Sequence, residues 1–350
     1  MPKRKERGAA TVTILDVARH AGVSPMTVSR VINGHSYVGE EMRQRVEASV
    51  KALRYTPNLA GRSLRSSGSA RIGVLYSNPS AAYLNQFMLG VLEQGSQSGS
   101  QLLIEKCSGI RSQRAATERL LAAGVDGVIL PPPLCDSRSA VEELESAGVP
   151  VVAVATGSPM DGVASVRIDD YQGARAMTRY LLELGHRDIG FIKGDPQHTP
   201  AALRAAAFFD TMKEAGLAVP PGRIAQGLFT YRSGLAAAEQ LLKAPNRPTA
   251  IFSSNDDMAA AVVSVAHGLG LHVPEELTVT GFDDTPVATT VWPELTTIHQ
   301  PVAAMARAAM VLIQDEIRRK RSGRPKAATH QVMKFTLVKR QSSASPATSA

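Results

Sequence analysis

The sequence predicts an α/β protein with a small helical head, followed by a core of parallel sheets wound with helices on both faces. Three observations support this. The first 65 of the 350 residues hold 12 Lys and Arg against 5 Asp and Glu, so they carry a net charge of +7. The same residues contain a helix-turn-helix pattern. Beyond residue 70, short β-branched runs alternate with helical patterns, which is typical of parallel α/β sheets.

Length and composition predict two or three globular domains, because 350 residues with 44% hydrophobic and 20% charged residues can bury a large core. The first residues lack the apolar run of a secretory signal, and no stretch approaches the ~20 apolar residues that span a bilayer. Cys107 and Cys135 have no metal-type spacing. We therefore expect a cytoplasmic protein with reduced thiols, no metal, no cofactor and no membrane partner.

The head contains start and stop signals for three helices. Thr13 and Asp16 stand at the N-cap and N3 positions of the first helix. Gly22 turns the chain, Ser24 caps the second helix, and Pro25 occupies its first position. A third helix follows, with an apolar repeat at Met42, Val46, Val50 and Leu53.

The second helix of such a motif enters the major groove of DNA with its N-terminal residues at the base edges. Arg30 can read guanine or hold a phosphate, whereas Met26 favours an apolar contact such as a thymine methyl. Hydroxyl and amide side chains suit phosphates, which set register without reading sequence. The predicted DNA contacts of the head are Thr13, Ser24, Pro25, Met26, Thr27, Ser29, Arg30 and Asn33.

The stretch TILDVARHAGVSPMTVSRVING, residues 13–34, resembles the DNA-binding head of the lactose-repressor (LacI/GalR) family of bacterial transcription regulators. The similarity continues through LRYTPNLAGRSL, residues 53–64. It implies a hinge from residue 57 to about 64 that becomes helical on operator DNA. It also implies that an apolar side chain of the hinge opens a base step in the minor groove.

Four hinge residues are expected to contact DNA: Asn58, Gly61, Leu64 and Arg65. The resemblance makes Leu64 the inserted wedge. Gly61 stands where the family usually has alanine. Because glycine in a helix costs about 0.5–1 kcal/mol relative to alanine, we expect this hinge to fold less readily.

In the core, polar residues follow several predicted strands. The strands are expected at residues 72–76, 102–104, 127–130, 151–154, 189–192, 250–252 and 278–280. Ligands of parallel α/β sheets bind at the carboxyl ends of the strands. Ser77, Asn78, Asn255 and Asp283, which come just after strands, are therefore candidates for a binding site.

The family resemblance covers the core as well, through GVDGVIL at 124–130, LGHRDIG at 184–190, IFSSNDDMA at 251–259 and GFDD at 281–284. It implies two doubly wound subdomains like those of a periplasmic sugar-binding protein, with the ligand in the cleft between them. The chain would cross between subdomains near residues 169–170, 299–301 and 325. A helix from Val302 to about Arg321 would pack in the first subdomain.

Carried over residue by residue, the resemblance implies specific contacts to an effector. Arg204 would bind ligand hydroxyls or carboxylates, Asn255 and Asp283 would clamp a sugar, and Phe229 would stack on its face. Tyr83 would lie in the loop that closes over the ligand, and His198 could face either the cleft or solvent. With Ser77, these give the predicted effector site: Ser77, Tyr83, Arg204, Phe229, Asn255 and Asp283.

The sequence departs from the family pattern near this site. Ala207 replaces the glycine of an Arg-x-x-Gly word, and the loop of residues 76–83 lacks the usual Pro-Asp and Asn-Pro-Phe-Phe words. We expect both changes to touch the pocket, so the effector cannot be transferred from a relative. One arginine and one acid favour a neutral or singly acidic carbohydrate over a phosphorylated one.

Two other classes of protein fit less well. His186-Arg187-Asp188 imitates a kinase triplet, but no glycine-rich loop precedes it, and the chain lacks a Gly-x-Ser-x-Gly elbow, zinc spacing and a P-loop, so we expect no enzyme. A solute-binding or transport component remains the alternative, and the basic head opposes it. The partners expected are palindromic operator DNA, a small-molecule effector and a second copy of the chain, as a homodimer.

The predicted organisation has five segments. Residues 1–10 form a basic arm, 11–56 the helix-turn-helix domain, and 57–70 the hinge and linker. Residues 71–340 form the effector-binding and dimerisation core, and 341–350 a disordered tail, which is polar and has no leucine heptad.

Overall fold

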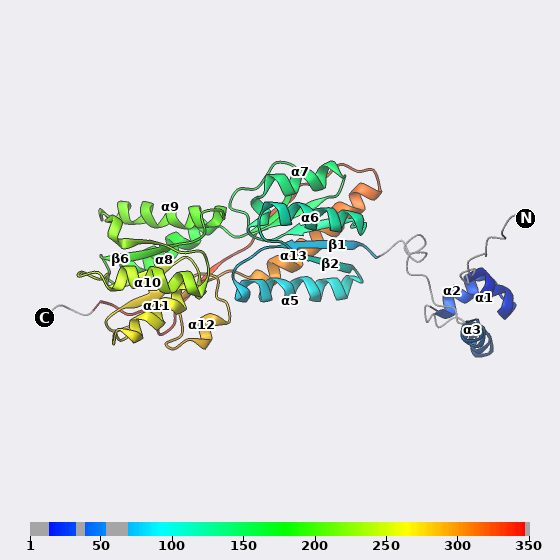
Figure 1. Cartoon of the computed structure of the whole chain (residues 1–350), viewed down its shortest axis with the longest axis horizontal. Coiled ribbons are helices and arrows are strands. Elements are labelled where there is room, and N and C mark those ends of the chain that lie inside the picture. Colours follow the sequence, from blue (N-terminus) through cyan, green and yellow to red (C-terminus); the bar gives the residue numbers. More distant parts are fainter. Residues whose placement is uncertain (1–13, 33–38, 54–68, 347–350) are drawn as a thin grey trace, which may run out of the picture. The chain divides into compact units, whose positions relative to one another are not determined.

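The computed structural model describes residues 14–32, 39–53 and 69–346 (Figure 1). The chain divides into two compact units, Met1–Ser69 and Ala70–Ala350. The division falls within one residue of the expected end of the linker. The predicted hinge residues lie outside the described ranges.

The head unit contains the three expected helices, α1 (Ile14–Ala21), α2 (Pro25–Ile32) and α3 (Glu40–Ala52). Gly22 has φ +64°, which permits the tight turn between α1 and α2. The Arg45 guanidinium of α3 donates to the Ala21 carbonyl at 2.8 Å, so the third helix satisfies the end of the first. The buried core consists of Val17, Ala18, Ala21, Val28, Val31 and Val46. Met42, expected on the apolar face of α3, is 41% exposed instead.

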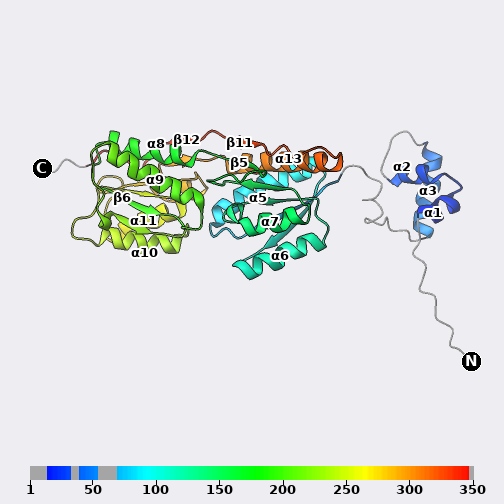
Figure 2. The same ribbon diagram turned by 90° about the horizontal axis from the view of Figure 1, so that it is seen from above.

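The second unit contains two subdomains, each a parallel sheet with helices on both faces (Figures 1 and 2). The first has strand order β11-β5-β4-β3-β1-β2 and the second β7-β6-β8-β9. The first sheet comprises β1 (Arg71–Tyr76), β2 (Gln101–Lys106), β3 (Gly127–Leu130), β4 (Val151–Val154), β5 (Ala164–Arg167) and β11 (His330–Val332). The second comprises β6 (Ile189–Lys193), β7 (Ile224–Gln226), β8 (Ala250–Ser253) and β9 (Thr278–Thr280). This is the predicted fold class.

Helices cover both faces of each sheet. In the first subdomain, α5 (Ala81–Ser98) packs with α13 (Val302–Arg321), and α6 (Ile110–Ala122) packs with α7 (Arg138–Ser146) on the opposite face. In the second, α8 (Asp170–Glu183) packs with α9 (Thr199–Glu214), and α10 (Tyr231–Leu242) with α11 (Asp256–Gly268). A short helix, α12 (Val287–Thr290), contacts α11. Helix α13 has the predicted bounds and the predicted subdomain.

The chain passes between the subdomains three times. The first passage joins β5 to α8 and the second joins β10 (Thr297–His299) to α13, both where expected. The third lies between β11 and β12 (Thr336–Val338), so the expected position near residue 325 is wrong. After α13 the chain first adds β11 in parallel to β5 at the edge of the first sheet, and crosses only then. β12 pairs antiparallel with β10.

The expectation of a disordered tail is also wrong for residues 341–346. Ser342 is fully buried, and its hydroxyl donates to the Val279 carbonyl at 2.6 Å. The Val279 amide in turn donates to the Ser342 carbonyl at 2.8 Å. β9 is the edge strand of the second sheet, and the tail satisfies backbone groups that this edge would otherwise leave unpaired.

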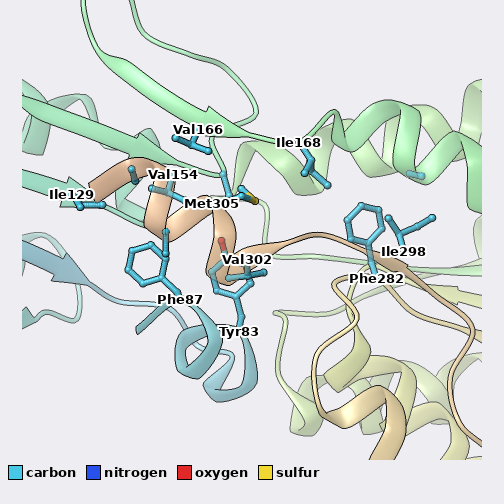
Figure 3. Close-up of a cluster of buried hydrophobic side chains, with 14 of the residues drawn as sticks. Tyr83, Phe87, Ile129, Val154, Val166, Ile168, Phe282, Ile298, Val302 and Met305 are labelled. Atoms are coloured by element: carbon cyan, nitrogen blue, oxygen red, sulfur yellow. The ribbon is translucent and has the colours of Figure 1, made fainter. Parts of the chain in front are cut away.

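One apolar cluster runs through both subdomains (Figure 3). Figure 3 shows Tyr83 beside Val302 of α13, and Phe282 beside Ile298 of β10, the strand that leads into the second passage. The cluster therefore anchors the segments that connect the subdomains. Within the described ranges, no helix combines the length and apolar character that a membrane span requires.

Gly90 of α5 marks the closest approach of α5 and α13. A Cβ there would lie 2.2 Å from the Ala303 carbonyl oxygen. Alanine gains about 1 kcal/mol in helix propensity, but overpacking costs about 1–3 kcal/mol, so we expect Gly90→Ala to destabilise the protein. The control is Gly268→Ala in α11, where a Cβ meets nothing within 4 Å. Urea denaturation should show a loss for the first variant and none for the second; equal stabilities would contradict the close packing.

Candidate functional site

A small cleft lies between the two subdomains at the carboxyl ends of their strands. Five of the six predicted effector residues line it: Tyr83, Arg204, Phe229, Asn255 and Asp283. Ser77 does not, because the loop after β1 reaches the cleft further along, at Asn78 and Ser80. His198, for which the sequence left two positions open, also lines it and is 4% exposed. Ala207 lies in the apolar core and not in the cleft, so the expectation that it alters the pocket is wrong.

Arg204 occupies the centre of the cleft and is almost fully buried. Its Nε donates to Asp170 Oδ1 at 2.8 Å, and its Nη1 donates to the Ser254 carbonyl at 2.5 Å. The guanidinium carbon lies 3.6 Å from the centre of the Phe282 ring, a cation–π contact. Asp283 Oδ1 lies 3.5 Å from Nη1. Two carboxylates thus face one cation, so an anionic ligand would have to displace an internal partner.

Asp283 follows β9 and has φ +108°, an unusual conformation for an aspartate. Gln300 Nε2 donates to its Oδ1 at 2.7 Å. Burial raises the pKa of Asp283 to about 7, although Arg204 and the Gln300 hydrogen bond oppose the rise. The carboxyl group therefore changes charge near neutral pH.

Phe229 and Asn255 form the wall contributed by the second subdomain. Phe229 has φ +58°, and its ring lies against Gly194, where a Cβ would come within 2.1 Å of the ring. The His198 ring lies 5.1 Å from it. Asn255 Nδ2 donates to the Phe229 carbonyl at 3.1 Å, and Asn255 Oδ1 caps α11 by accepting from the Met258 amide. Asn255 therefore has a structural role in addition to its position in the cleft.

Two polar atoms in the cleft are buried without a hydrogen-bond partner among the described residues, Tyr83 Oη and Gln300 Oε1. Burial also raises the pKa of Tyr83 well above its ordinary value, so the group stays a neutral phenol. An unsatisfied buried polar group costs about 1–3 kcal/mol. A ligand that donates to the amide oxygen and bonds the phenol would recover that cost.

The cleft encloses only about 30 Å³, enough for about one water molecule. Ligand sites measure roughly 300–1,000 Å³. The structure therefore represents a closed arrangement of the subdomains, and a ligand larger than water needs them to move apart.

Two carboxylates hold the subdomains together beside the cleft. The Ser80 hydroxyl at the start of α5 donates to Asp257 Oδ2 of α11 at 2.5 Å. Asp136, in the 3₁₀ turn Leu134–Asp136 of the first subdomain, accepts from the Thr199 amide at 3.1 Å and hydroxyl at 2.8 Å. Asp136 thus satisfies the first turn of α9, a helix of the other subdomain.

In the head, α2 presents the predicted DNA-contacting side chains that the structure describes. Met26 is 65% exposed and Arg30 is exposed. Ser24 Oγ accepts from the Thr27 amide at 3.1 Å, as its predicted capping role requires, and the two hydroxyls lie 2.9 Å apart. Pro25 begins the helix as expected. Thr13, Asn33, Asn58, Gly61, Leu64, Arg65 and the Ser29 side chain lie outside the described residues.

Comparison with known proteins places both parts of the chain. The family model "Bacterial regulatory proteins, lacI family" matches residues 13–58, and "Periplasmic binding protein-like domain" matches residues 178–343. The HTH-type transcriptional repressor PurR of Klebsiella pneumoniae subsp. pneumoniae is 36% identical over 316 residues, covering 88% of this chain and 91% of PurR. The chain belongs to the lacI family.

Two solved structures of similar proteins contain ligands. The lac repressor dimer bound to operator and the anti-inducer ONPF has a TM-score of 0.80 and 29% identity, covering 96% of this chain and 100% of that one. The transcriptional regulator CelR in complex with cellobiose has a TM-score of 0.71 and 31% identity, covering 95% and 99%. This lacI-family chain is therefore a DNA-binding regulator with a periplasmic-binding-protein-like core.

Sequence reasoning missed three residues of this lacI-family cleft and its closure: Gln300, Ser80 and Asp136. Gln300 lies in the expected second passage, so its position could have drawn attention to it. Ser80 has the signal of a helix N-cap, but nothing in the sequence indicates its partner in α11. Asp136 contacts a helix more than 60 residues away, which only the tertiary structure shows. The described residues contain no cluster of metal-ligating side chains.

We expect Asp283→Asn to change the pH dependence of stability. The ordinary pKa of 3.8 applies in the unfolded chain and about 7 in the folded one, so between these values the folded state holds an extra proton. The stabilising contribution of the protonated Asp283 carboxyl is fully present below about pH 4 and is lost as pH rises through about 7. The free energy of unfolding of wild type, relative to the variant, should fall from pH 4.5 to 7.5 in urea titrations. A pH-independent difference would contradict the assignment.

We expect Asp136→Ala to loosen the closed arrangement. The Thr199 amide loses its acceptor, and the Gly157 amide, which donates to Thr199 Oγ1 at 2.7 Å across the same contact, should lose protection as well. Hydrogen exchange measures both. The control is Thr230→Ala, which removes the cap of α10 within the second subdomain at a cost of about 1 kcal/mol. Unchanged exchange at Gly157 in Asp136→Ala would show that this contact does not hold the subdomains together.

Proposed function

We propose that this protein is a transcriptional repressor that binds palindromic operator DNA as a homodimer and that a small neutral carbohydrate in the cleft controls this binding. The observation that carries the proposal is the pair of unsatisfied buried atoms, Tyr83 Oη and Gln300 Oε1, in a cleft attached to a DNA-binding head. A solute-binding protein without regulatory role would not need the head.

The charge balance of the cleft supports a neutral effector. Asp170 alone matches the charge of Arg204 and Asp283 is a second acid beside it, so a phosphate would leave excess negative charge in a buried site. Hydroxyl groups can instead satisfy Gln300 and Tyr83, while the Phe229 ring covers an apolar sugar face. CelR, with cellobiose, and the lac repressor, with ONPG, are relatives solved with sugar ligands.

Opening and closing of the cleft would provide the control. A carbohydrate larger than the present space can enter only if the Ser80–Asp257 and Asp136–Thr199 hydrogen bonds break. Once it is bound, these hydrogen bonds either form again or stay broken. The chain connects the subdomains at three passages, so such a movement changes the orientation of the first subdomain relative to the second. The head is attached to the first subdomain. Coupling between two such sites is typically 1–3 kcal/mol and reciprocal.

The first subdomain offers a surface for the homodimer. Leu89 and Leu92 of α5 are 56% and 49% exposed, and Ile104 of the edge strand β2 is 43% exposed. Large exposed apolar residues on neighbouring elements are typical of an interface. Two copies would present two heads to the half-sites of a palindrome.

A thermal-shift screen of the full chain against cellobiose, monosaccharides, sugar acids and sugar phosphates tests the effector class. A ligand at 100 times its Kd adds about 2.7 kcal/mol of stability, so we expect a neutral sugar to raise Tm by several degrees. Tyr83→Phe and Gln300→Ala should each raise the Kd of that ligand about fivefold or more, because each removes a buried hydrogen bond to it.

The matched control is Tyr231→Phe, since Tyr231 is exposed on α10 and its hydroxyl donates to Ser264 outside the cleft. An equal loss of ligand affinity in the control variant would contradict the neutral-carbohydrate proposal. So would a rise in Tm with sugar phosphates alone.

Selection of bound duplexes from a random DNA pool tests whether the protein binds a palindromic operator. Arg30→Ala should weaken binding to the selected DNA by about 1–3 kcal/mol without changing the rise in Tm caused by the sugar.

A further inference from the structure

Seven cations gather at the end of the core where the chain arrives from the head, and we call them the basic surface. They are Arg71, Arg318, Arg319, Lys320, Arg321, Arg324 and Lys326. Asp126 links two of these residues, because its Oδ2 accepts from the Arg71 amide at 2.8 Å and its Oδ1 accepts from Arg321 at 2.9 Å. The C-terminal end of α13 therefore lies close to the first residue of β1.

The basic surface departs from the charge of the core around it. Four carboxylates accompany its seven cations: Asp126, Glu145, Asp315 and Glu316. Its net charge is thus +3, whereas residues 66–350 as a whole hold 27 Lys and Arg against 26 Asp and Glu. The rest of the core holds 20 Lys and Arg against 22 Asp and Glu, so the excess of positive charge in the core comes from this surface.

Helix stabilisation explains only part of this surface. Cations in the last turn of α13 favour the helix dipole, and Arg318 and Arg319 also pair with Asp315 at 3.4 and 3.0 Å. Arg324 and Lys326 lie beyond the helix, however. Lys320 and Arg324 are exposed and form no ion pair with any described residue, and both line a groove of about 370 Å³ with Arg319.

We propose that the basic surface binds backbone phosphates of the DNA that flanks the site held by the head. This inference rests on the proposed function. The chain between Leu53 and Arg71 can span at most about 65 Å, so bound DNA stays within that reach of the surface. Such tethering gives even weak phosphate contacts a high effective concentration. The contacts would add affinity and salt dependence without reading sequence.

The test uses the full chain and a 60-base-pair duplex of random sequence, with the association constant measured by fluorescence anisotropy from 50 to 200 mM NaCl. The variant is Lys320→Gln with Arg324→Gln, which breaks no ion pair of the described residues. The matched control is Lys213→Gln with Arg232→Gln, two exposed cations on α9 and α10 that likewise form no ion pair there. Both pairs remove two charges.

We expect the variant to bind several-fold more weakly at 100 mM NaCl and to lose about one unit of salt slope for each phosphate contact removed. The control should match wild type. Equal slopes in variant and control, with wild type binding DNA, would overturn this inference alone, whereas absence of DNA binding by wild type would overturn the proposed function too. Stabilisation of wild type, but not the variant, by inorganic phosphate with equal slopes would mark a small-anion site and also overturn it.

Discussion

The buried guanidinium of Arg204 is the constraint on which the core depends. A charge out of water needs partners, and removing one from a buried ion pair costs about 3–5 kcal/mol. Asp170 supplies one partner at the start of α8, where the chain first enters the second subdomain, and Asp283 supplies another after β9. Gln300, at the second passage, holds Asp283 in place. One side chain therefore ties the cleft to two of the three connections between the subdomains, and the shape of the cleft cannot change without affecting those connections.

The same arrangement makes ligand binding and subdomain movement a single equilibrium. A ligand must displace or reuse hydrogen bonds that already exist, so only the difference between its contacts in the open and closed arrangements can shift the population. Tyr83 Oη and Gln300 Oε1 supply that difference, because the closed protein leaves both unsatisfied. The carboxylates of Asp136 and Asp257 act against this shift of the population, because they hold the subdomains closed without a ligand. The balance between these groups sets how much ligand binding can move the core.

Sequence reasoning was strongest where a local rule met the family resemblance. The position of Asn255 and Asp283 after strands follows from the topology of parallel sheets, and the helix from 302 to 321 is what the family resemblance implies. Reasoning failed where long-range packing decides. β11 is short and exposed, so nothing local marks it as a strand, and the predicted third passage lies too early in the chain. The tail is polar, yet its backbone satisfies the edge of β9. The role of Asp136 depends on a helix N-terminus that only the folded chain brings near it.

Helix α13 connects the cleft to the basic surface. It begins two residues after Gln300, the residue that holds Asp283 in the cleft, and ends in the cations beside the first residue of β1. Its 20 residues span about 30 Å, and the helix packs closely on α5 at Gly90. A movement that begins at the second passage is therefore transmitted by a rigid element, not absorbed by a loop. Because such coupling is reciprocal, phosphates held at the far end of α13 would bias the cleft as strongly as a ligand in the cleft biases the grip on DNA.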